Sequence, residues 1–269
     1  MKKILSAIFA CGLLVLLALV FQRNFYEVPV LMYHRVDVSD RESGVYVRPE
    51  NFEKQMEFLK VHRYHVMPLE TLIQDLKARR RNPPKSVVIT FDDGTLDNIK
   101  NAFPVLKTMG FPATVFMITE NIGRPGWLSE EDLKILDEGG VSIGSHTLNH
   151  AYLPELPVSR VQEEIAGSKK RLEGILGHEV TLFSYPAGGV TPQIREFVEK
   201  AGYAGAVTTN YGKERHDPYS LHRVKVGDSS GNLFNFLAKT SGFYSLGKKR
   251  VSHRAADPAP AEDYLTVGQ

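Results

Sequence analysis

Short apolar segments typical of buried strands alternate with segments of helical periodicity along most of this chain, and this alternation constrains its fold most. The segment 86–90 (SVVIT) is rich in β-branched residues, as buried strands are. Similar segments lie at 28–33, 113–118, 141–145, 181–185, 204–208 and 222–226. Strands that alternate with helices form parallel sheets. About seven or eight such strands favour an α/β barrel, closed or nearly closed, over an open sheet.

Polar residues follow the ends of several predicted strands. His34, the pair Asp92 and Asp93, and His146 each come directly after an apolar segment, and Pro186 opens a loop after another. In a parallel barrel the carboxyl ends of all strands meet at one rim, where active sites form. We therefore expect these side chains to share one rim.

The adjacent carboxylates Asp92 and Asp93 need a physical explanation. At the end of a buried strand two such groups are costly to desolvate, and they repel each other unless a cation or a proton intervenes. An exposed turn is the alternative, because Asp and a following glycine, here Gly94, are common in turns. The pair alone does not decide between these interpretations.

Two histidines supply further candidate ligands. His146 and His150 stand four residues apart, so both imidazoles can face one ligand from a tight helical turn. A loop histidine is more often only solvated or hydrogen-bonded, so the pair by itself is weak evidence. Two histidines and one rim carboxylate, with a fourth position left to water, form the arrangement of a catalytic zinc site. The second carboxylate is then free to act as a base on that water.

Three motifs in this chain resemble those of the polysaccharide deacetylase family, the carbohydrate esterases of the NodB-homology type. TFDDG at 90–94 and SHTLNH at 145–150 resemble the first two motifs, and FSYPAGG at 183–189 resembles the third. The resemblance covers roughly residues 28–226. It implies a distorted (β/α) barrel with seven or eight strands that removes N-acetyl groups from amino sugars in polymers.

The resemblance also implies a role for each matching residue. Asp92 would be the general base, and the metal ligands would be Asp93, His146 and His150. The ligand set suits zinc, although cobalt, nickel or iron can occupy similar ligands. At the third motif, the backbone N–H of Ala187 would help to hold the oxyanion.

The chain departs from the family pattern in its later motifs. The third motif usually carries an arginine that contacts the base, but Ser184 stands there, and Arg223 is the expected replacement. The fourth motif's Asp-Trp pair has no counterpart, and the only tryptophan, Trp127, lies elsewhere.

The N-terminal segment 29–36 (PVLMYHRV) is similar to a subgroup with permuted motifs that includes poly-N-acetylglucosamine deacetylases. This similarity makes His34 the expected general acid and His222 the rival. The plain alternative for His34 is a strand-end residue satisfied by a backbone hydrogen bond.

The two ends of the chain differ in character from its middle. Lys2 and Lys3 precede an uncharged, mostly aliphatic stretch at 4–21, which we interpret as an uncleaved signal-anchor. We accordingly expect a transmembrane segment at 1–24, an exported barrel domain at 25–245 on the periplasmic or extracellular side, and a disordered tail at 246–269. The alternative is a cleaved signal peptide, in which case the protein would be secreted. The only cysteine, Cys11, lies in the first segment, so the barrel holds no disulfide.

Composition restricts the remaining function classes. The formal net charge of +2 gives no case for nucleic-acid binding. Two alternatives to a deacetylase of N-acetylglucosamine polymers stay open. One is a glycan-binding barrel without catalysis, and the other is an enzyme acting on a different amide, in peptidoglycan, a lipid-linked sugar or a non-sugar compound.

Overall fold

The computed structural model describes residues 9, 11–14, 16–17, 20–22, 25–38, 45–209 and 217–246, without the side chains of 229 and 230. The predicted anchor at 4–21 therefore lies only partly among the described residues, and almost all of the predicted tail at 246–269 lies outside them. Among the described residues, no helix has the length and apolar character needed to span a membrane. The anchor and the tail stay predictions.

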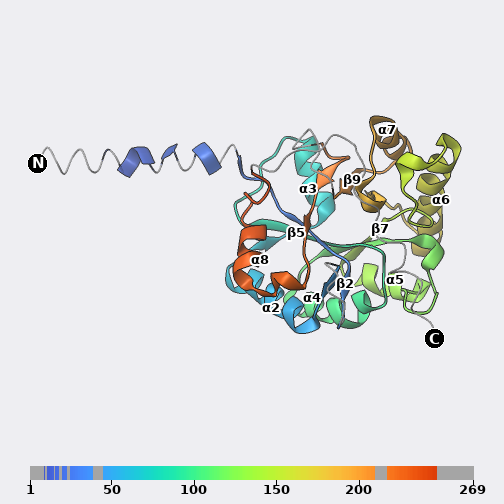
Figure 1. Cartoon of the computed structure of the whole chain (residues 1–269), viewed down its shortest axis with the longest axis horizontal. Helices are drawn as coiled ribbons and strands as arrows, with labels where there is room; N and C mark the ends of the chain where they lie inside the picture. The colour runs from blue at the N-terminus through green and yellow to red at the C-terminus, as the bar shows by residue number, and fades with distance from the viewer. Residues whose placement is uncertain are drawn as a thin grey trace, which may run out of the picture.

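The centre of the molecule is a ring of parallel strands surrounded by helices (Figure 1). The strands of the ring are β1 (Val30–Tyr33), β5 (Ser86–Phe91), β6 (Ala113–Met117), β7 (Val141–Ser145), β8 (Leu182–Ser184), β9 (Gly205–Thr208), β10 (Leu221–His222) and β11 (Val224–Lys225). Each pairs in parallel with its neighbour in the order β10-β9-β8-β7-β6-β5-β1-β11. Short strands β2 (Arg35–Val36) and β3 (Tyr46–Val47) pair with each other, and β4 (His65–Val66) pairs with β5.

One extended segment closes the ring. The strands β10 and β11 are separated only by Arg223, and β10 pairs with β9 while β11 pairs with β1. The Arg223 N–H donates to the Thr208 carbonyl, and the Val226 N–H donates to the Met32 carbonyl. The expected α/β barrel is thus confirmed as a nearly closed ring of parallel strands.

The helices follow the strands as the sequence pattern predicts. They are α2 (Pro49–Val61), α3 (Leu69–Lys77), α4 (Phe103–Met109), α5 (Glu130–Glu138), α6 (Val158–Leu176), α7 (Pro192–Lys200) and α8 (Leu233–Thr240). The sequence pattern of Ser129 and Asp132 predicts a capping box, which is present at the start of α5, and Gly110 and Gly177 end α4 and α6 in the left-handed conformation. Ser159 and Gln162 form a capping pattern that predicts a helix start at Ser159, but this prediction was wrong, because α6 begins at Val158 with Pro157 as its N-cap.

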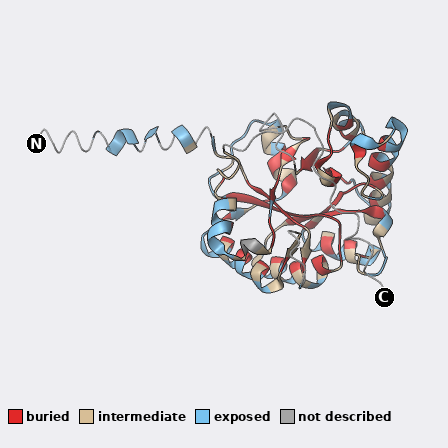
Figure 2. Ribbon diagram, in the orientation of Figure 1, coloured by how far each residue is buried: buried red, intermediate tan, exposed pale blue. Residues whose placement is uncertain are grey.

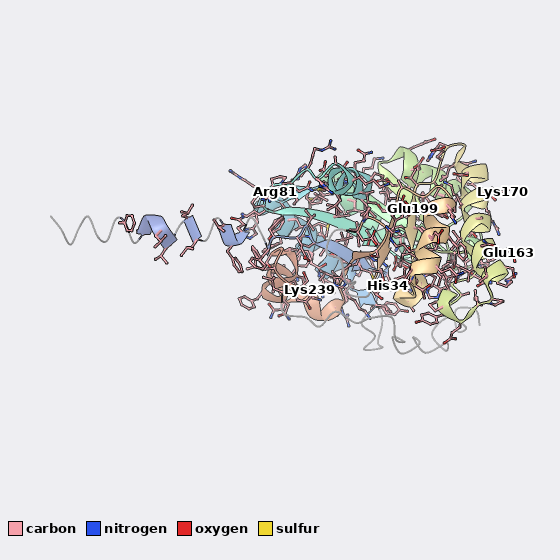
Figure 3. All side chains as sticks on the ribbon, turned by 90° about the horizontal axis from the view of Figure 1, so that it is seen from above. His34, Arg81, Glu163, Lys170, Glu199 and Lys239 are labelled. Atoms are coloured by element: carbon pink, nitrogen blue, oxygen red, sulfur yellow. The ribbon has the colours of Figure 1, made fainter. Side chains whose placement is uncertain are left out.

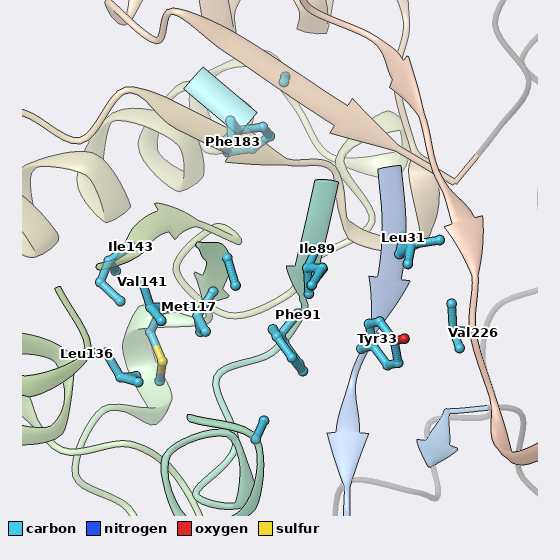
Figure 4. Packing of buried hydrophobic residues seen from close by; sticks show 14 of the residues in the cluster. Leu31, Tyr33, Ile89, Phe91, Met117, Leu136, Val141, Ile143, Phe183 and Val226 are labelled. Carbon is cyan, nitrogen blue, oxygen red and sulfur yellow. The ribbon is translucent and has the colours of Figure 1, made fainter. Parts of the chain in front are cut away.

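Two hydrophobic clusters hold the barrel together. The larger fills the space between strands and outer helices, where Tyr33, Phe91 and Phe183 are buried (Figure 4). The smaller lies inside the ring and draws one residue from each of six strands: Val30, Val88, Phe116, Leu182, Val207 and Leu221. Residues of α3 complete this inner cluster. Burial is therefore continuous along the strands, whereas the outer helix surfaces are exposed (Figure 2).

Strand β7 contributes a glycine to the barrel interior. A Cβ on Gly144 would lie 2.5 Å from the Phe116 ring and 3.1 Å from the Leu182 carbonyl oxygen. The missing side chain therefore makes room for the phenylalanine of the neighbouring strand.

Candidate metal centre and active site

Strand alternation carries polar side chains into one end of the barrel. Side chains two or four positions apart on a strand share a face. Asp92 follows inward-facing Val88 by four positions, and Ser184 and Arg223 follow inward-facing Leu182 and Leu221 by two. By the same count, His34 follows Val30 and His146 follows Gly144. These polar residues therefore form the layer above the inner hydrophobic cluster.

Asp93 reaches the same cluster by a different route, because alternation alone would turn it outward. It adopts a left-handed backbone conformation with φ 74°, which is uncommon for a residue with a side chain. Gly94 follows with φ 81°, and a Cβ there would lie 2.1 Å from the Met117 sulfur. The tight turn thus depends on glycine at 94 and brings both carboxylates to one place.

Asp93, His146 and His150 form a cluster suited to a metal ion. One ligand atom from each lies within 4.8 Å of the others. The Asp93 Oδ1 atom is 3.7 Å from His146 Nε2 and 3.8 Å from His150 Nε2. These separations are too long for hydrogen bonds. Ligand atoms bonded to one zinc ion at about 2.1 Å in a tetrahedron lie about 3.4 Å apart, so the two separations from Asp93 Oδ1 need only a small contraction to reach that range.

The surroundings of these atoms fit a cation. Asp93 Oδ1 is buried, yet it accepts no hydrogen bond from the part of the chain that the structure describes. His146 Nδ1 lies 2.8 Å from the Ser184 carbonyl oxygen, which fixes the ring and leaves the Nε2 lone pair directed at the cluster. Carboxylate and imidazole donors are those that zinc and similar ions take.

Burial also sets the charge state of the ligands. It lowers the pKa of His146 to about 3 and lowers the pKa of His150, so both imidazoles are neutral at pH 7. Burial, and to a smaller extent the Asp92 charge, raise the pKa of Asp93 to about 6, against the opposing influence of His34. A bound cation would relieve this cost of holding Asp93 ionised.

The turn between the two histidines differs from the expected helical one. Residues 147–149 form a non-helical turn, with Thr147 at φ 68° and His150 at φ 64°. The expectation of one helical turn was therefore wrong, although the two imidazoles do meet, with ring centroids 4.8 Å apart. Spacing alone could not reveal the left-handed residues.

Asp92 is locked by an arginine. Arg223 Nη1 and Nη2 donate to the two carboxylate oxygens of Asp92 at 2.6 and 2.5 Å, and Arg223 is only 1% exposed. The same guanidinium donates to Ser184 Oγ at 2.9 Å. Burial raises the pKa of Asp92, but the positive charge of Arg223 and the nearby His146 outweigh it and hold this pKa well below its usual range.

The two candidate general acids lie differently. His34 is close enough to Asp93 and Asp92 for their charges to raise its pKa, although burial has the larger effect and lowers it. Its Nδ1 atom is buried and forms no hydrogen bond with the described residues. His222 directly precedes Arg223, so alternation directs its side chain away from the barrel interior. The geometry therefore groups His34, rather than His222, with the carboxylates.

Sequence reasoning missed the residue that holds His34. Asn98 begins a π-helix at Asn98–Ala102, and its Nδ2 donates to the His34 carbonyl oxygen at 2.9 Å. Asp97 accepts the N–H of Val36 at 2.6 Å in the same region. No periodicity signals these contacts, although single turns of π-helix often mark functional sites.

The third-motif loop that holds Ala187 follows Ser184, whose carbonyl oxygen contacts His146. Pro186–Gly188 forms a short 3₁₀ turn after β8, in which Ala187 takes the left-handed conformation with φ 50°. The Gly188 and Gly189 N–H groups donate to Tyr185 and Pro186 carbonyls, whereas no donation by the Ala187 N–H occurs within the described residues. This N–H therefore remains available as a donor.

Comparisons with known proteins agree with this geometry. The sequence model of the polysaccharide deacetylase family matches residues 79–206. YxkH of Bacillus subtilis (strain 168), whose name assigns it to polysaccharide deacetylases, is 36% identical over 211 residues, which cover 77% of this chain and 75% of that protein. The poly-beta-1,6-N-acetyl-D-glucosamine N-deacetylase of Staphylococcus aureus (strain MSSA476) is 24% identical over 74% of this chain and 73% of its own length.

A solved structure gives the same result for the fold. The Streptococcus pyogenes deacetylase PplD, determined in complex with acetate, superposes with a TM-score of 0.73 and 27% sequence identity, covering 80% of this chain and 97% of that one. The family match, the relative and the shared barrel together establish that this chain belongs to the polysaccharide deacetylase family.

Proposed function

We propose that this protein is a metal-dependent hydrolase that removes N-acetyl groups from N-acetylglucosamine-type units of an envelope or extracellular polysaccharide. Membership of the family supports amide hydrolysis on a polysaccharide. One observation carries the metal dependence: the buried Asp93 Oδ1 has no hydrogen-bond partner among the described residues and lies beside two imidazole Nε2 atoms.

The proposed roles follow from the position of each group. A divalent cation, most simply zinc, would be held by Asp93, His146 and His150, would polarise the acetyl carbonyl and would make a water molecule more acidic. Asp92, kept ionised and oriented by Arg223, would accept the proton of the attacking water.

Two further groups would stabilise the negative oxygen formed by water addition and protonate the departing amine. The Ala187 N–H would donate to the oxygen that becomes negative when the water adds to the amide carbon. His34 would protonate the departing amine, since it lies within electrostatic reach of both carboxylates. His222 keeps its place as the rival acid only if substitution of His34 has no effect.

The choice of sugar rests on a relative. The Staphylococcus aureus protein is named for deacetylation of poly-beta-1,6-N-acetyl-D-glucosamine, and its match covers most of the barrel. We therefore take β-1,6-linked N-acetylglucosamine oligomers as the first substrate. Export to the periplasmic or extracellular side, with attachment to the membrane through residues 4–21, completes the proposal, because such polymers lie outside the cytoplasm.

The test is acetate release by the purified full-length chain. We expect release from β-1,6-linked oligomers, its loss after chelation and its return on adding zinc or cobalt. Asp92→Asn should keep the metal but lose about 10²–10⁴-fold in rate, as expected for removal of a general base. Glu57→Gln, at an exposed carboxylate on α2, should leave the rate unchanged.

Two results would contradict the proposal. Full activity of Asp92→Asn with its metal bound would remove Asp92 from the reaction. Metal binding without acetate release from β-1,6 oligomers, β-1,4 oligomers or peptidoglycan fragments would identify the barrel as a glycan-binding module or as an enzyme for another amide.

A further inference from the structure

A buried carboxylate outside the active site contacts the turn that joins the two histidines. Glu164 lies in the second turn of α6 and is fully buried. Its Oε2 atom accepts the backbone N–H of Leu148 at 2.9 Å and that of Asn149 at 3.2 Å. A charged group that is removed from water in this way is costly unless its hydrogen bonds repay the cost.

The turn has a conformation that needs outside support. Thr147 and His150 both adopt left-handed backbone angles, which cost of order 1–3 kcal/mol each in residues with side chains. Such residues persist only where the surroundings determine their conformation. The angle at His150 also sets the direction of its imidazole, so whatever fixes the turn fixes a candidate ligand.

Every amide of the turn donates to a side-chain oxygen. Besides the two bonds to Glu164, the Thr147 N–H donates to Ser145 Oγ at 3.2 Å and the His150 N–H donates to Thr147 Oγ1 at 3.0 Å. Only Glu164 comes from outside residues 145–150. Glu164 is therefore the acceptor that ties the amides of the turn to another element, while the Thr147 and Leu148 carbonyls accept the backbone N–H groups of Thr119 and Glu120.

Helix α6 is fitted closely to this turn. A Cβ on Gly167 would lie 3.2 Å from Leu148 Cδ1, so the absence of a side chain at 167 lets the leucine approach the helix. Ser168 Oγ lies 2.7 Å from Ser145 Oγ, one residue before His146. The other oxygen of Glu164 lies 3.6 Å from Arg160 Nη2, which balances part of the buried charge.

We propose that Glu164 is a positioning residue for the metal centre, whose carboxylate holds the turn 147–150 so that His150 faces Asp93 and His146. The inference rests on the proposed function, because it assigns the turn a metal ligand to position. What matters is the reach of the side-chain oxygen to the two amides. Partners behind the ligands of a metal commonly change its affinity by about 10–100-fold.

Two conservative substitutions separate reach from charge. Glu164→Asp keeps the charge but withdraws the carboxylate by one methylene from the amides of Leu148 and Asn149. Glu164→Gln keeps the reach and an accepting oxygen but removes the charge. Glu163→Asp is the matched control, since Glu163 neighbours Glu164 but lies on the exposed side of α6, as Lys170 does (Figure 3).

Zinc affinity of the full-length chain and amide hydrogen exchange of the metal-free chain are the two measurements. We expect Glu164→Asp to weaken zinc binding by about 10–100-fold and to speed exchange at 148 and 149. Glu164→Gln should lose less affinity than Glu164→Asp, and Glu163→Asp should match the unsubstituted chain.

The possible results distinguish this inference from the proposed function. Unchanged affinity in Glu164→Asp, or a greater loss in Glu164→Gln than in Glu164→Asp, overturns the positioning role. An unsubstituted chain that binds no zinc overturns the metal centre and, with it, the assignment of Glu164 to a ligand. If the unsubstituted chain binds zinc and the Glu164 variants change zinc affinity as expected, but no acetate is released, only the deacetylase proposal is rejected.

Discussion

The buried carboxylate of Asp92 is paired with a positive charge, Arg223, from a strand that is distant in the sequence. At the position where the family usually has an arginine, Ser184 has a small side chain that leaves space for the Arg223 guanidinium and accepts a hydrogen bond from it. Arg223, which makes the bidentate contact, lies in the segment that closes the barrel and is far from Asp92 in the sequence. A positive group thus still faces the carboxylate.

Removing this arginine should be strongly destabilising. Arg223→Met leaves Asp92 buried without its cation, and breaking a buried pair in this way costs about 3–5 kcal/mol in the free energy of unfolding. Urea unfolding of the metal-free chain measures the loss. Adding Asp92→Asn should recover a large part of it, since no unpaired charge then remains. A double variant as unstable as Arg223→Met would contradict this explanation.

The sequence predicted some of these residues better than others. Strand alternation places Asp92, His146 and Arg223 inside the barrel. Because every second side chain of a strand faces the same side, this placement can be predicted from the sequence. Asp93 and His150 arrive through left-handed backbone angles, and no pattern of side chains reports those. Glu164 and Asn98 act through backbone groups of other elements, so their contacts exist only after the chain has folded.

At the level of the element, the residues on the inner side of each strand pack against those of the neighbouring strands. Strand β7 has glycine at the position where its neighbours carry bulky residues, and the Phe116 ring occupies that space. The apolar segments predicted the strands, but they could not show which glycine compensates for which ring. Likewise the Ser159 pattern satisfied a capping rule, while the proline before Val158 began the helix earlier.

Two glycine substitutions should act in opposite directions. Gly144→Ala places a methyl group 2.5 Å from the Phe116 ring inside the barrel, so we expect a loss of about 1–3 kcal/mol in the free energy of unfolding. Gly174→Ala lies in α6 with no atom within 4 Å of its new Cβ, so it should gain about 0.5–1 kcal/mol. Denaturant unfolding compares the two, and a stable Gly144→Ala barrel would show that the interior yields more easily than the packing indicates.

For the whole molecule, closure of the barrel depends on the segment that carries β10 and β11. Asp217 precedes this segment, accepts the Tyr219 N–H and the Ser220 hydroxyl, and pairs with Arg195 of α7 at 2.7 and 2.8 Å. The closing segment is thus fastened to a helix on the outside of the barrel. Periodicity predicted a last strand here but not that one segment joins both edges of the ring.

This fastening predicts a specific dependence of stability on pH. Burial raises the pKa of Asp217, but its hydrogen bonds and the Arg195 charge outweigh burial and lower it. A carboxylate with a lowered folded-state pKa stabilises above its unfolded pKa of about 3.9 and loses that contribution as pH falls through the folded value. Asp217→Asn should therefore be less stable than the unsubstituted chain at pH 7, with a difference that shrinks below pH about 4. A difference that stays constant down to pH about 3 would contradict the assignment.

The central claim is that Asp93, His146 and His150 hold one metal ion on which amide hydrolysis depends. The most direct test is to titrate zinc into the metal-stripped chain while following acetate release from β-1,6-linked N-acetylglucosamine oligomers. We predict no release without metal, a rise that saturates at one zinc per chain, and no rise in Asp93→Ala. Full acetate release by the stripped chain, or equal activation of Asp93→Ala, would contradict the account.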